Sequence, residues 1–343
     1  MRYFKLISAG AIAAMMAIFP AVVPTRTPAQ FVPAAAPNQP AARAQLVRTL
    51  IAHPDTGVYD FALSSDAQTI VSTSRDRSVR VFKWRDNVQD LRIDAEVLNT
   101  WFSAVSISPD GQTLVTRRTD NIIQLRDLTS GQVRTTLSPS SGLGIAAIAA
   151  NNRTLVDASG TGGDFSIRLW DLDNQQSRSI GGNWANLTAI TPDGYILVAA
   201  SQTGTATVWN LVRGQRLSTF STGATEGATA IAISADGLRV FVAKTGRVEE
   251  WNARTGRLTR SLLQTNAPIT ALAVSPNGQT LAIGFGNYIQ MRDLRSNRPL
   301  YNLSNSATSG QVMRFSPDGR VFFNSDGSGQ SAVNDRLRVW QLP

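Results

Sequence analysis

The 343-residue chain contains no cysteine and a single histidine. The lack of cysteine excludes a disulfide framework, thiolate chemistry and a lipid-modified N-terminal cysteine. One imidazole cannot build a histidine-based metal site, and His53, beside Pro54, is a poor candidate for a catalytic base. We interpret it as an ordinary loop histidine. The stability of the chain must therefore come from packing and strand pairing.

Lysine is also scarce, because 30 of the 33 basic residues are arginine. The formal net charge is +9, but four basic residues and no acidic residue precede position 45, which leaves +5 on the rest of the chain. The arginines are scattered singly, and the Lys/Arg runs of a phosphate-binding surface do not occur. The sequence predicts no nucleic-acid partner.

The N-terminus has the pattern of a secretory signal peptide. Arg2 and Lys5 provide a positive start, an uncharged apolar run extends from Leu6 to Phe19, and Thr27 and Ala29 are small residues at suitable cleavage positions. We predict a signal peptide over residues 1–29, export to the periplasm or the exterior, and no membrane span in the mature protein. The lesser alternative is an uncleaved anchor over residues 6–23.

Proline and alanine dominate the next segment. Six of the 15 prolines lie between residues 20 and 44, which favours an extended, semi-rigid chain. We therefore predict a linker over residues 30–44 and a folded domain over residues 45–343. Over the whole chain, apolar residues make up 42% and charged residues 17%, which suits a well-packed globular protein.

A β-rich hexapeptide recurs seven times in this domain. The copies are VRVFKW, IQLRDL, IRLWDL, ATVWNL, VEEWNA, IQMRDL and LRVWQL, and their fourth positions are Phe82, Arg126, Trp170, Trp209, Trp251, Arg292 and Trp340. A period of roughly 40 residues built from short strands is typical of a β-propeller, in which each repeat forms one four-stranded blade.

Two further marks accompany most repeats. A turn such as SPDG at 108–111 or SPNG at 275–278 follows an upstream strand, with Pro and Gly at the positions that such a turn favours. Asp76, Asp120 and Asp164 each lie six residues before the fourth hexapeptide position. A short acidic side chain there can bond to its own turn backbone, so we assign these three a structural role.

These residues resemble the WD-repeat family, and IRLWDL at 167–172 is the nearest match to its motif. The resemblance implies a seven-bladed, all-β propeller of four-stranded antiparallel blades. The repeats are degenerate: only Trp170 and Asp171 form a Trp-Asp pair, and no Gly-His dipeptide precedes a blade. We therefore expect the side-chain hydrogen-bond network that uses this His to be missing.

The two ends of the domain predict how the ring closes. An outer strand follows each of the first six hexapeptides, but the chain stops one residue after the seventh. Its counterpart is AQLVRTL at 44–50, ahead of the first repeat. We expect this segment to complete the last blade and remove the open sheet edges of the ring.

No constellation of catalytic residues emerges from the sequence. The strand register predicts a channel mouth without groups that ionise near neutral pH, lined by Tyr59, Ser103, Gly144, Asn186, Thr229, Thr270 and Gln311. Glu249 and Glu250 are adjacent, so period-two alternation sends them to opposite faces. We expect no enzymatic activity, cofactor or metal.

Surface recognition is the remaining hypothesis. In relatives of this fold, partners usually bind the face that carries the loops into the innermost strands and the turns before the third strands. That face corresponds here to Tyr59, Arg75, Trp101, Arg117, Arg118, Trp184, Asn186, Lys244 and Phe285. We predict a monomeric, exported scaffold that binds a protein or peptide. The alternatives are a hydrolase or lyase acting on a sugar or lactone, and a small-ligand sensor.

Overall fold

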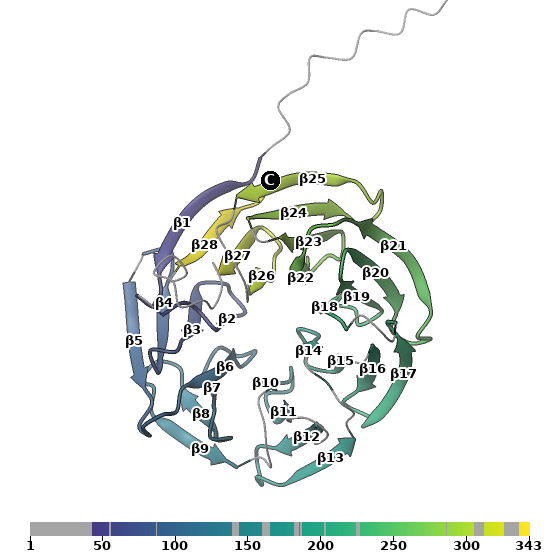
Figure 1. Cartoon of the computed structure of the whole chain (residues 1–343). Coiled ribbons are helices and arrows are strands. Elements are labelled where there is room, and N and C mark those ends of the chain that lie inside the picture. The colour runs from purple at the N-terminus through teal and green to yellow at the C-terminus, as the bar shows by residue number, and fades with distance from the viewer. Residues whose placement is uncertain are drawn as a thin grey trace, which may run out of the picture. The chain divides into compact units, whose positions relative to one another are not determined.

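The computed structural model describes residues 43–343 except 55, 87, 139–143, 160–164, 182–184, 186, 202–203, 224–226, 286, 305–311 and 326–335. Within these residues 28 strands form seven four-stranded antiparallel sheets, and no helix occurs. Figure 1 shows the sheets as blades around a common centre. The all-β, seven-bladed prediction is confirmed. The predicted signal peptide and most of the predicted linker lie outside the described residues.

Each blade runs from an innermost to an outermost strand. Blade one contains β2 (Asp60–Leu63), β3 (Thr69–Thr73), β4 (Ser78–Lys83) and β5 (Val88–Asp94). Blade two contains β6 (Phe102–Ile107), β7 (Thr113–Arg118), β8 (Ile123–Asp127) and β9 (Val133–Leu137), and blade three contains β10 (Gly144–Ile148), β11 (Thr154–Ser159), β12 (Ser166–Asp171) and β13 (Ser177–Gly181). Blade four contains β14 (Leu187–Ile190), β15 (Ile196–Ala200), β16 (Thr205–Asn210) and β17 (Gln215–Ser221).

The remaining three blades follow the same order. Blade five contains β18 (Ala230–Ile233), β19 (Arg239–Lys244), β20 (Arg247–Asn252) and β21 (Leu258–Gln264), and blade six contains β22 (Ile269–Val274), β23 (Thr280–Phe285), β24 (Tyr288–Asp293) and β25 (Pro299–Ser304). Blade seven contains β26 (Met313–Phe315), β27 (Val321–Ser325) and β28 (Arg336–Gln341), with β1 (Gln45–Ile51) as its outermost strand.

The ring closes through β1, as the sequence predicts. This strand pairs antiparallel with β28, so that Leu50 lies opposite Leu337 and Thr49 lies opposite Arg338. The pairing joins the first and last strands of the domain and gives β28 a neighbour on both sides (Figure 1). A strand edge that would otherwise be open to another chain is thereby covered.

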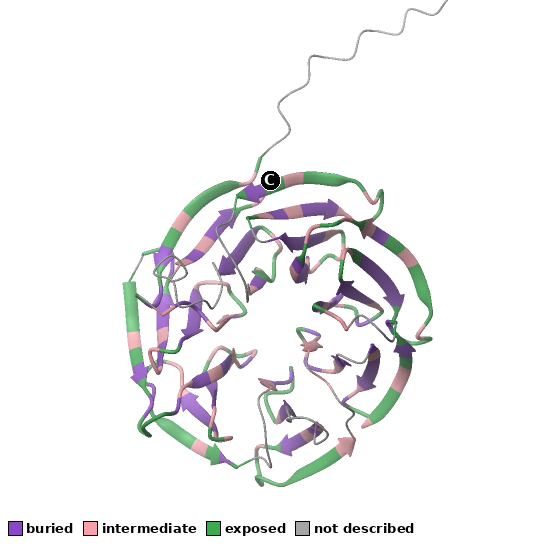
Figure 2. Ribbon diagram, in the orientation of Figure 1, coloured by how far each residue is buried: buried purple, intermediate pink, exposed green. Residues whose placement is uncertain are grey.

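The core lies between the blades. The middle strands are largely buried whereas the outermost strands expose most of their residues (Figure 2). Seven apolar clusters are formed, one at each junction of neighbouring blades. At the junction of blades seven and one, Phe61 and Phe323 are among the fully buried side chains. Burying a side chain of this size contributes about 1.5–3 kcal/mol.

The repeated turns have a common hydrogen-bond pattern. In the turn at 108–111, Ser108 Oγ accepts the Thr113 N–H at 2.8 Å and donates to Asp110, while Gly111 adopts φ +71°. The first repeat has SSDA in this place, and Ala67 takes up the left-handed conformation with φ +54°. In this first repeat Ser64 Oγ still accepts the Thr69 N–H, at 2.9 Å, so the hydroxyl contact is kept without the glycine.

Candidate functional site

One end of the propeller carries the loops that enter the innermost strands. Because consecutive strands of a blade are antiparallel, the turns between second and third strands lie at the same end, and the other two kinds of turn lie at the opposite end. We call the first end the entry face. Seven of the nine predicted interaction residues are described, and they belong to the loops of this face and the adjoining strand ends. They differ in exposure.

Tyr59 and Arg75 form one unit on the entry face of blade one. Arg75 is exposed, and its Nε donates to Tyr59 Oη at 2.7 Å while the guanidinium carbon lies 5.4 Å from the ring centroid. This contact holds an aromatic ring and a cation together in a half-exposed position. Tyr and Arg are side chains that frequently anchor protein interfaces.

Trp101 is half-buried at the entrance to blade two. Its backbone N–H donates to Thr119 Oγ1 at 3.2 Å, and its carbonyl accepts the Thr119 N–H at 3.0 Å. These two bonds fix the loop before β6 to the turn after β7. Trp101 is thus held at the entry face and is only partly buried.

Four predicted interaction residues are buried, which corrects the expectation that they form exposed contacts. Arg117 is 0% exposed and forms an ion pair with Asp157 of blade three, with 2.6 Å between Nη1 and Oδ1. Arg118 pairs with Asp120, and Lys244 pairs with Glu249. The remaining member, Phe285, stacks on Tyr288 with 4.6 Å between the ring centroids. Trp184 and Asn186 lie outside the described residues.

The burial of these cations has a physical cause that sequence alternation does not reveal. Each arginine or lysine points toward a carboxylate, and for Arg117 that carboxylate belongs to the neighbouring blade. A buried cation requires such a partner because an isolated charge is strongly disfavoured away from water. In the conformation described here, these cations therefore offer little surface to a partner molecule.

Two exposed apolar side chains on the entry face are not among the predicted interaction residues. Val97 and Leu98 lie in the loop between β5 and β6 and are 44% and 76% exposed. The Ala95 N–H donates to the Arg77 carbonyl at 2.8 Å, which ties the start of this loop to the turn that carries Arg75. The available signal was two adjacent apolar residues in a loop, where polar residues prevail. We call Tyr59, Arg75, Val97, Leu98 and Trp101 the rim patch.

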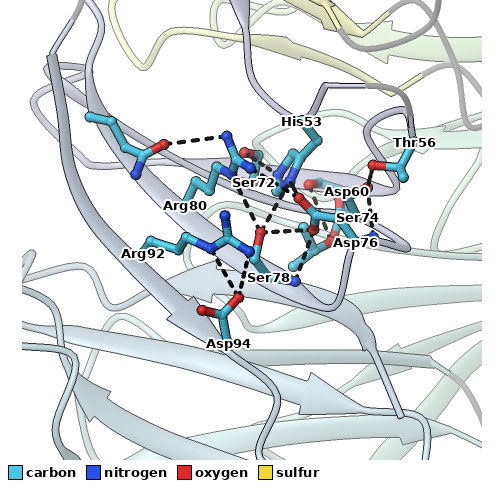
Figure 3. Close-up of polar contacts among 12 residues, drawn as sticks. His53, Thr56, Asp60, Ser72, Ser74, Asp76, Ser78, Arg80, Arg92 and Asp94 are labelled. Atoms are coloured by element: carbon cyan, nitrogen blue, oxygen red, sulfur yellow. Dashed lines mark hydrogen bonds and ion pairs between the residues drawn. The ribbon is translucent and has the colours of Figure 1, made fainter. Parts of the chain in front are cut away.

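The expected loss of the histidine network is wrong for blade one. His53 is fully buried, its Nδ1 lies 3.0 Å from Asp76 Oδ2, and its Nε2 lies 2.9 Å from Ser72 Oγ (Figure 3). The expectation rested on the missing Gly-His dipeptide, but Ala52 in place of that glycine leaves the imidazole in position. His53 lies in a loop, as interpreted, and acts there as a buried structural element.

The three acidic turn residues were assigned a structural role. Asp76 accepts the Ser78 N–H at 2.9 Å (Figure 3). Burial of Asp76 acts to raise its pKa. The hydrogen bond and the charge from His53, together with the hydrogen bonds from Ser78, outweigh burial and hold the pKa of Asp76 well below its usual range. The hydrogen bond from Arg118 likewise lowers the pKa of Asp120. Asp164 lies outside the described residues.

An ionisable residue lies beside the predicted channel mouth, on the innermost strand of blade one. Asp60 accepts the Val105 N–H of blade two at 3.3 Å and lies 3.5 Å from Arg314 of blade seven. Burial raises its pKa, although Arg314 and two backbone N–H groups favour the ionised form. Asp60 thus connects three blades at the centre. Of the seven predicted mouth residues, Asn186 and Gln311 are outside the described part of the chain.

Other acidic residues do not gather into a larger site. Glu249 and Glu250 contact different cations, Lys244 and Arg260, each through a salt bridge. In the part of the chain that the structure describes, no group of three or more His, Cys, Asp or Glu side chains is arranged to hold a metal ion. Nor does that part include a helix long and apolar enough to cross a membrane.

Comparison with known proteins agrees with the blade geometry. Residues 44–83, which run from β1 through β4, match the family described as "WD domain, G-beta repeat". Together with seven four-stranded blades, this match decides the family. The chain is a WD-repeat protein.

Three curated plant proteins are similar to this WD-repeat protein. The chain is 29% identical to the small ribosomal subunit protein RACK1y of Oryza sativa subsp. japonica over 44% of its own length and 46% of the relative. It is 23% identical to periodic tryptophan protein 2 of Arabidopsis thaliana, over 73% of this chain and 23% of the relative. The chain is 26% identical to autophagy-related protein 16 of Arabidopsis thaliana, over 54% of this chain and 36% of the relative. The alignments therefore span less than half the length of each relative.

The degenerate repeats change the hydrogen bonds of individual blades. Trp340 Nε1 donates to Asn324 Oδ1 at 2.8 Å in blade seven, and Trp209 Nε1 donates to Thr207 Oγ1 at 3.2 Å in blade four. Blade two has Arg126 at the corresponding position, and its Nη1 donates to the Gly131 carbonyl. The WD-repeat fold is thus retained in this protein by different side-chain pairs in different blades.

Proposed function

We propose that this WD-repeat protein is an exported, non-enzymatic scaffold that binds a protein or peptide through its rim patch. The observation that carries the proposal is the exposure of Val97 and Leu98 on the entry face, in a loop tied to the turn of Arg75. Leu98, at 76%, is the most exposed of the large apolar residues in the described chain. Exposed apolar groups beside polar ones favour association with another macromolecule.

The chemistry of the rim patch favours a mixed partner surface. Val97 and Leu98 would bury apolar area, Trp101 would add an aromatic face, and the Arg75–Tyr59 unit would donate hydrogen bonds at the edge. A peptide with an apolar side chain next to an acidic or carbonyl group matches this arrangement. The relatives support such a role in general terms, since RACK1y is named as a protein of the small ribosomal subunit.

The proposed location rests on the N-terminal sequence. Residues 1–29 have the charged start, apolar run and small-residue ending of a signal peptide. We propose export, with a partner in the cell envelope or outside the cell. Intact mass of the protein from its native host tests this step: a chain that starts at Gln30 supports cleavage, and a chain that retains residues 1–29 contradicts it.

The binding proposal is tested by crosslinking and capture in the native host. The variant carries Val97→Asp and Leu98→Asp, which place charge on the exposed apolar pair without altering the core. The matched control is Val212→Asp, because Val212 is 62% exposed in the turn between β16 and β17, on the opposite end of the propeller. We expect the double variant to lose at least tenfold of a specifically captured protein and the control to retain it. Equal capture by both variants would overturn the proposal.

A further inference from the structure

Arginines that stand singly in the sequence gather at the end of the propeller opposite the entry face. The turns between the third and fourth strands lie at that end, and in blades four, five and six they span residues 211–214, 253–257 and 294–298. These three turns carry five arginines and no acidic residue. We call them the arginine arc, which consists of Arg213, Arg254, Arg257, Arg295 and Arg298.

The equivalent turns of the first three blades have the opposite charge balance. They contain one arginine, Arg85, and two acidic residues, Asp86 and Asp173. The chain that leads into β1 reaches the propeller at the same end, and no acidic residue precedes position 45, so that segment brings no negative charge to the arc. Among these turns the excess of positive charge is therefore confined to one half of the ring.

Contacts between neighbouring blades join the turns of the arc. Ser218 Oγ on β17 donates to the Ala253 carbonyl at 2.6 Å, which ties blade four to the turn of blade five. The Arg260 guanidinium on β21 donates to the Leu294 carbonyl, which ties blade five to the turn of blade six. The outermost strands β17, β21 and β25 follow one another along the circumference of the ring (Figure 1). The five arginines therefore belong to one connected stretch of surface.

The charged ends of these side chains are not used by the fold. All five arginines are exposed, and within the described part of the chain none of their guanidinium groups forms a salt bridge or a hydrogen bond. Backbone atoms fix the turns instead, since the Arg213 N–H donates to Asn210 Oδ1 at 2.9 Å and the Arg254 N–H donates to Asn252 Oδ1 at 3.0 Å. Each guanidinium offers five N–H donors in a geometry that matches carboxylate and phosphate groups.

Acidic residues near the arc are hydrogen-bonded within their own turns. Asp293 Oδ1 accepts the N–H and the hydroxyl of Ser296 at 2.5 and 2.6 Å. Asp236 Oδ1 accepts the Leu238 N–H at 3.0 Å. These two residues and Asp193 are the acidic residues at this end of blades four to six, so five arginines face three carboxylates there. The positive charge of the arc is thus reduced but not cancelled.

We propose that the arginine arc binds a membrane surface that contains anionic phospholipids. Turns at one end of a propeller reach a broad, flat surface together, and arginine pairs with phosphate through parallel hydrogen bonds. Exposed apolar side chains lie beside the arc, since Val212, Leu258 and Leu300 are 62%, 50% and 51% exposed. Binding to a lipid interface grows with buried apolar area and with attraction to anionic lipids. This combination favours a membrane over an acidic peptide, which proteins usually bind in a groove or along a sheet edge.

The inference goes beyond the proposed scaffold function and does not rest on it, because the rim patch lies on the entry face. Strand β1 begins at the end that carries the arc, where Gln45 lies opposite Gln341 and Arg43 is exposed just before the strand. Contact with lipid through the arc would leave the entry face directed away from the membrane. The rim patch would then remain accessible to a protein partner.

Flotation with lipid vesicles tests the proposal on the full chain. One set of vesicles contains phosphatidylcholine and phosphatidylglycerol, and the other contains phosphatidylcholine alone. We expect the partition coefficient to be at least about a hundredfold higher for the anionic vesicles. Arg254→Gln with Arg257→Gln should lower it by about twentyfold, at roughly fivefold for each arginine near the lipid. Arg295→Gln with Arg298→Gln should have the same effect, and both variants should remain folded because the exchanged groups make no hydrogen bonds in the described chain.

The control variant is Arg85→Gln with Arg153→Gln, which removes the same charge at the same end of the propeller, from blades one and three. It should change the partition coefficient by less than about twofold, because salt screens the attraction of charges more than about 10 Å from the lipid. The apolar run near the N-terminus is common to all variants, so its contribution cancels when they are compared.

Equal partition into both kinds of vesicle would overturn the role of anionic lipid, and an equal loss in the control variant would overturn the assignment to the arc. Absence of vesicle binding would overturn the proposal, and binding of a glutamate-rich peptide in its place would assign the arc to an acidic protein segment. Val97→Asp with Leu98→Asp should bind vesicles like the wild type. Failure of the rim proposal is therefore distinguishable from failure of this one.

Discussion

The buried ion pair between blades two and three provides the sharpest test of how the propeller is held together. Arg117 on β7 and Asp157 on β11 are 2.6 Å apart, with side chains that are 0% and 2% exposed. We predict that Asp157→Ala costs about 3–5 kcal/mol, because it leaves the guanidinium buried without its carboxylate. For a domain of this size the melting temperature should fall by roughly 5–10 °C.

The free energy of unfolding that Asp157→Ala loses is larger than the net contribution of the intact Arg117–Asp157 ion pair. Bringing two charges out of water costs nearly as much as their attraction returns, so a well-packed apolar pair can replace them. We expect the double variant with Arg117→Met and Asp157→Leu to recover most of the stability that Asp157→Ala loses. Comparison of the two results separates the cost of an uncompensated charge from the value of the intact pair.

Urea unfolding monitored by tryptophan fluorescence measures these free energies of unfolding. The matched control is Asp173→Ala, which breaks the exposed pair of Asp173 with Arg153 and should cost about 0–1 kcal/mol. The reasoning would be refuted if Asp157→Ala cost no more than this control. A double variant no more stable than Asp157→Ala would refute the expectation that an apolar pair can replace the ion pair.

Three further predictions concern pH and backbone geometry. Because the folded-state pKa of Asp76 is lowered, its contribution to stability is fully present above about pH 4 and declines as the pH falls toward the folded-state pKa. Asp76→Asn should therefore reduce the urea midpoint more at pH 6 than near pH 2. The folded-state pKa of Asp60 is raised, so protonated Asp60 stabilises the fold below about pH 4, and this stabilisation is lost as the pH rises. Asp60→Asn should therefore gain stability relative to the wild type between pH 3 and pH 7 in urea unfolding. A stability difference that stays constant over this range would contradict the prediction. Gly111 has φ +71° and open space around it, so Gly111→Ala should lower the free energy of unfolding by about 1 kcal/mol. Gly246 has φ +73°, and a new Cβ there would lie only 2.4 Å from the Thr265 carbonyl oxygen. Gly246→Ala should therefore cost at least about 2 kcal/mol more, as measured by thermal unfolding.

The fold could be predicted from the sequence because its information is local and repeated. Seven hexapeptides set the number of blades, and the unmatched segment at 44–50 indicated the closing strand, which the structure gives as Gln45–Ile51. Alternation within a strand is a property of the backbone, so these features do not depend on distant contacts.

The site could be predicted less well because it depends on contacts between segments far apart in the sequence. Arg117 is buried because Asp157, 40 residues away, lies opposite it on the next blade. The environment of His53 is formed by Ser72 and Asp76. Neither contact is visible in the periodicity of a single strand.

An engineered disulfide between β1 and β28 directly tests whether β1 closes the ring. Thr49 lies opposite Arg338 across β1 and β28, and the natural chain has no cysteine that could form a competing bond. Directly paired strand residues fall within the Cα separations that a disulfide accepts. A variant with Thr49→Cys and Arg338→Cys should form an intramolecular disulfide on oxidation, seen as the loss of both free thiols in the monomer. The control variant, with Thr49→Cys and Arg216→Cys on β17, should keep both thiols free. Two free thiols in the oxidised monomer of the first variant, or equal crosslinking of both variants, would contradict closure of the ring by β1.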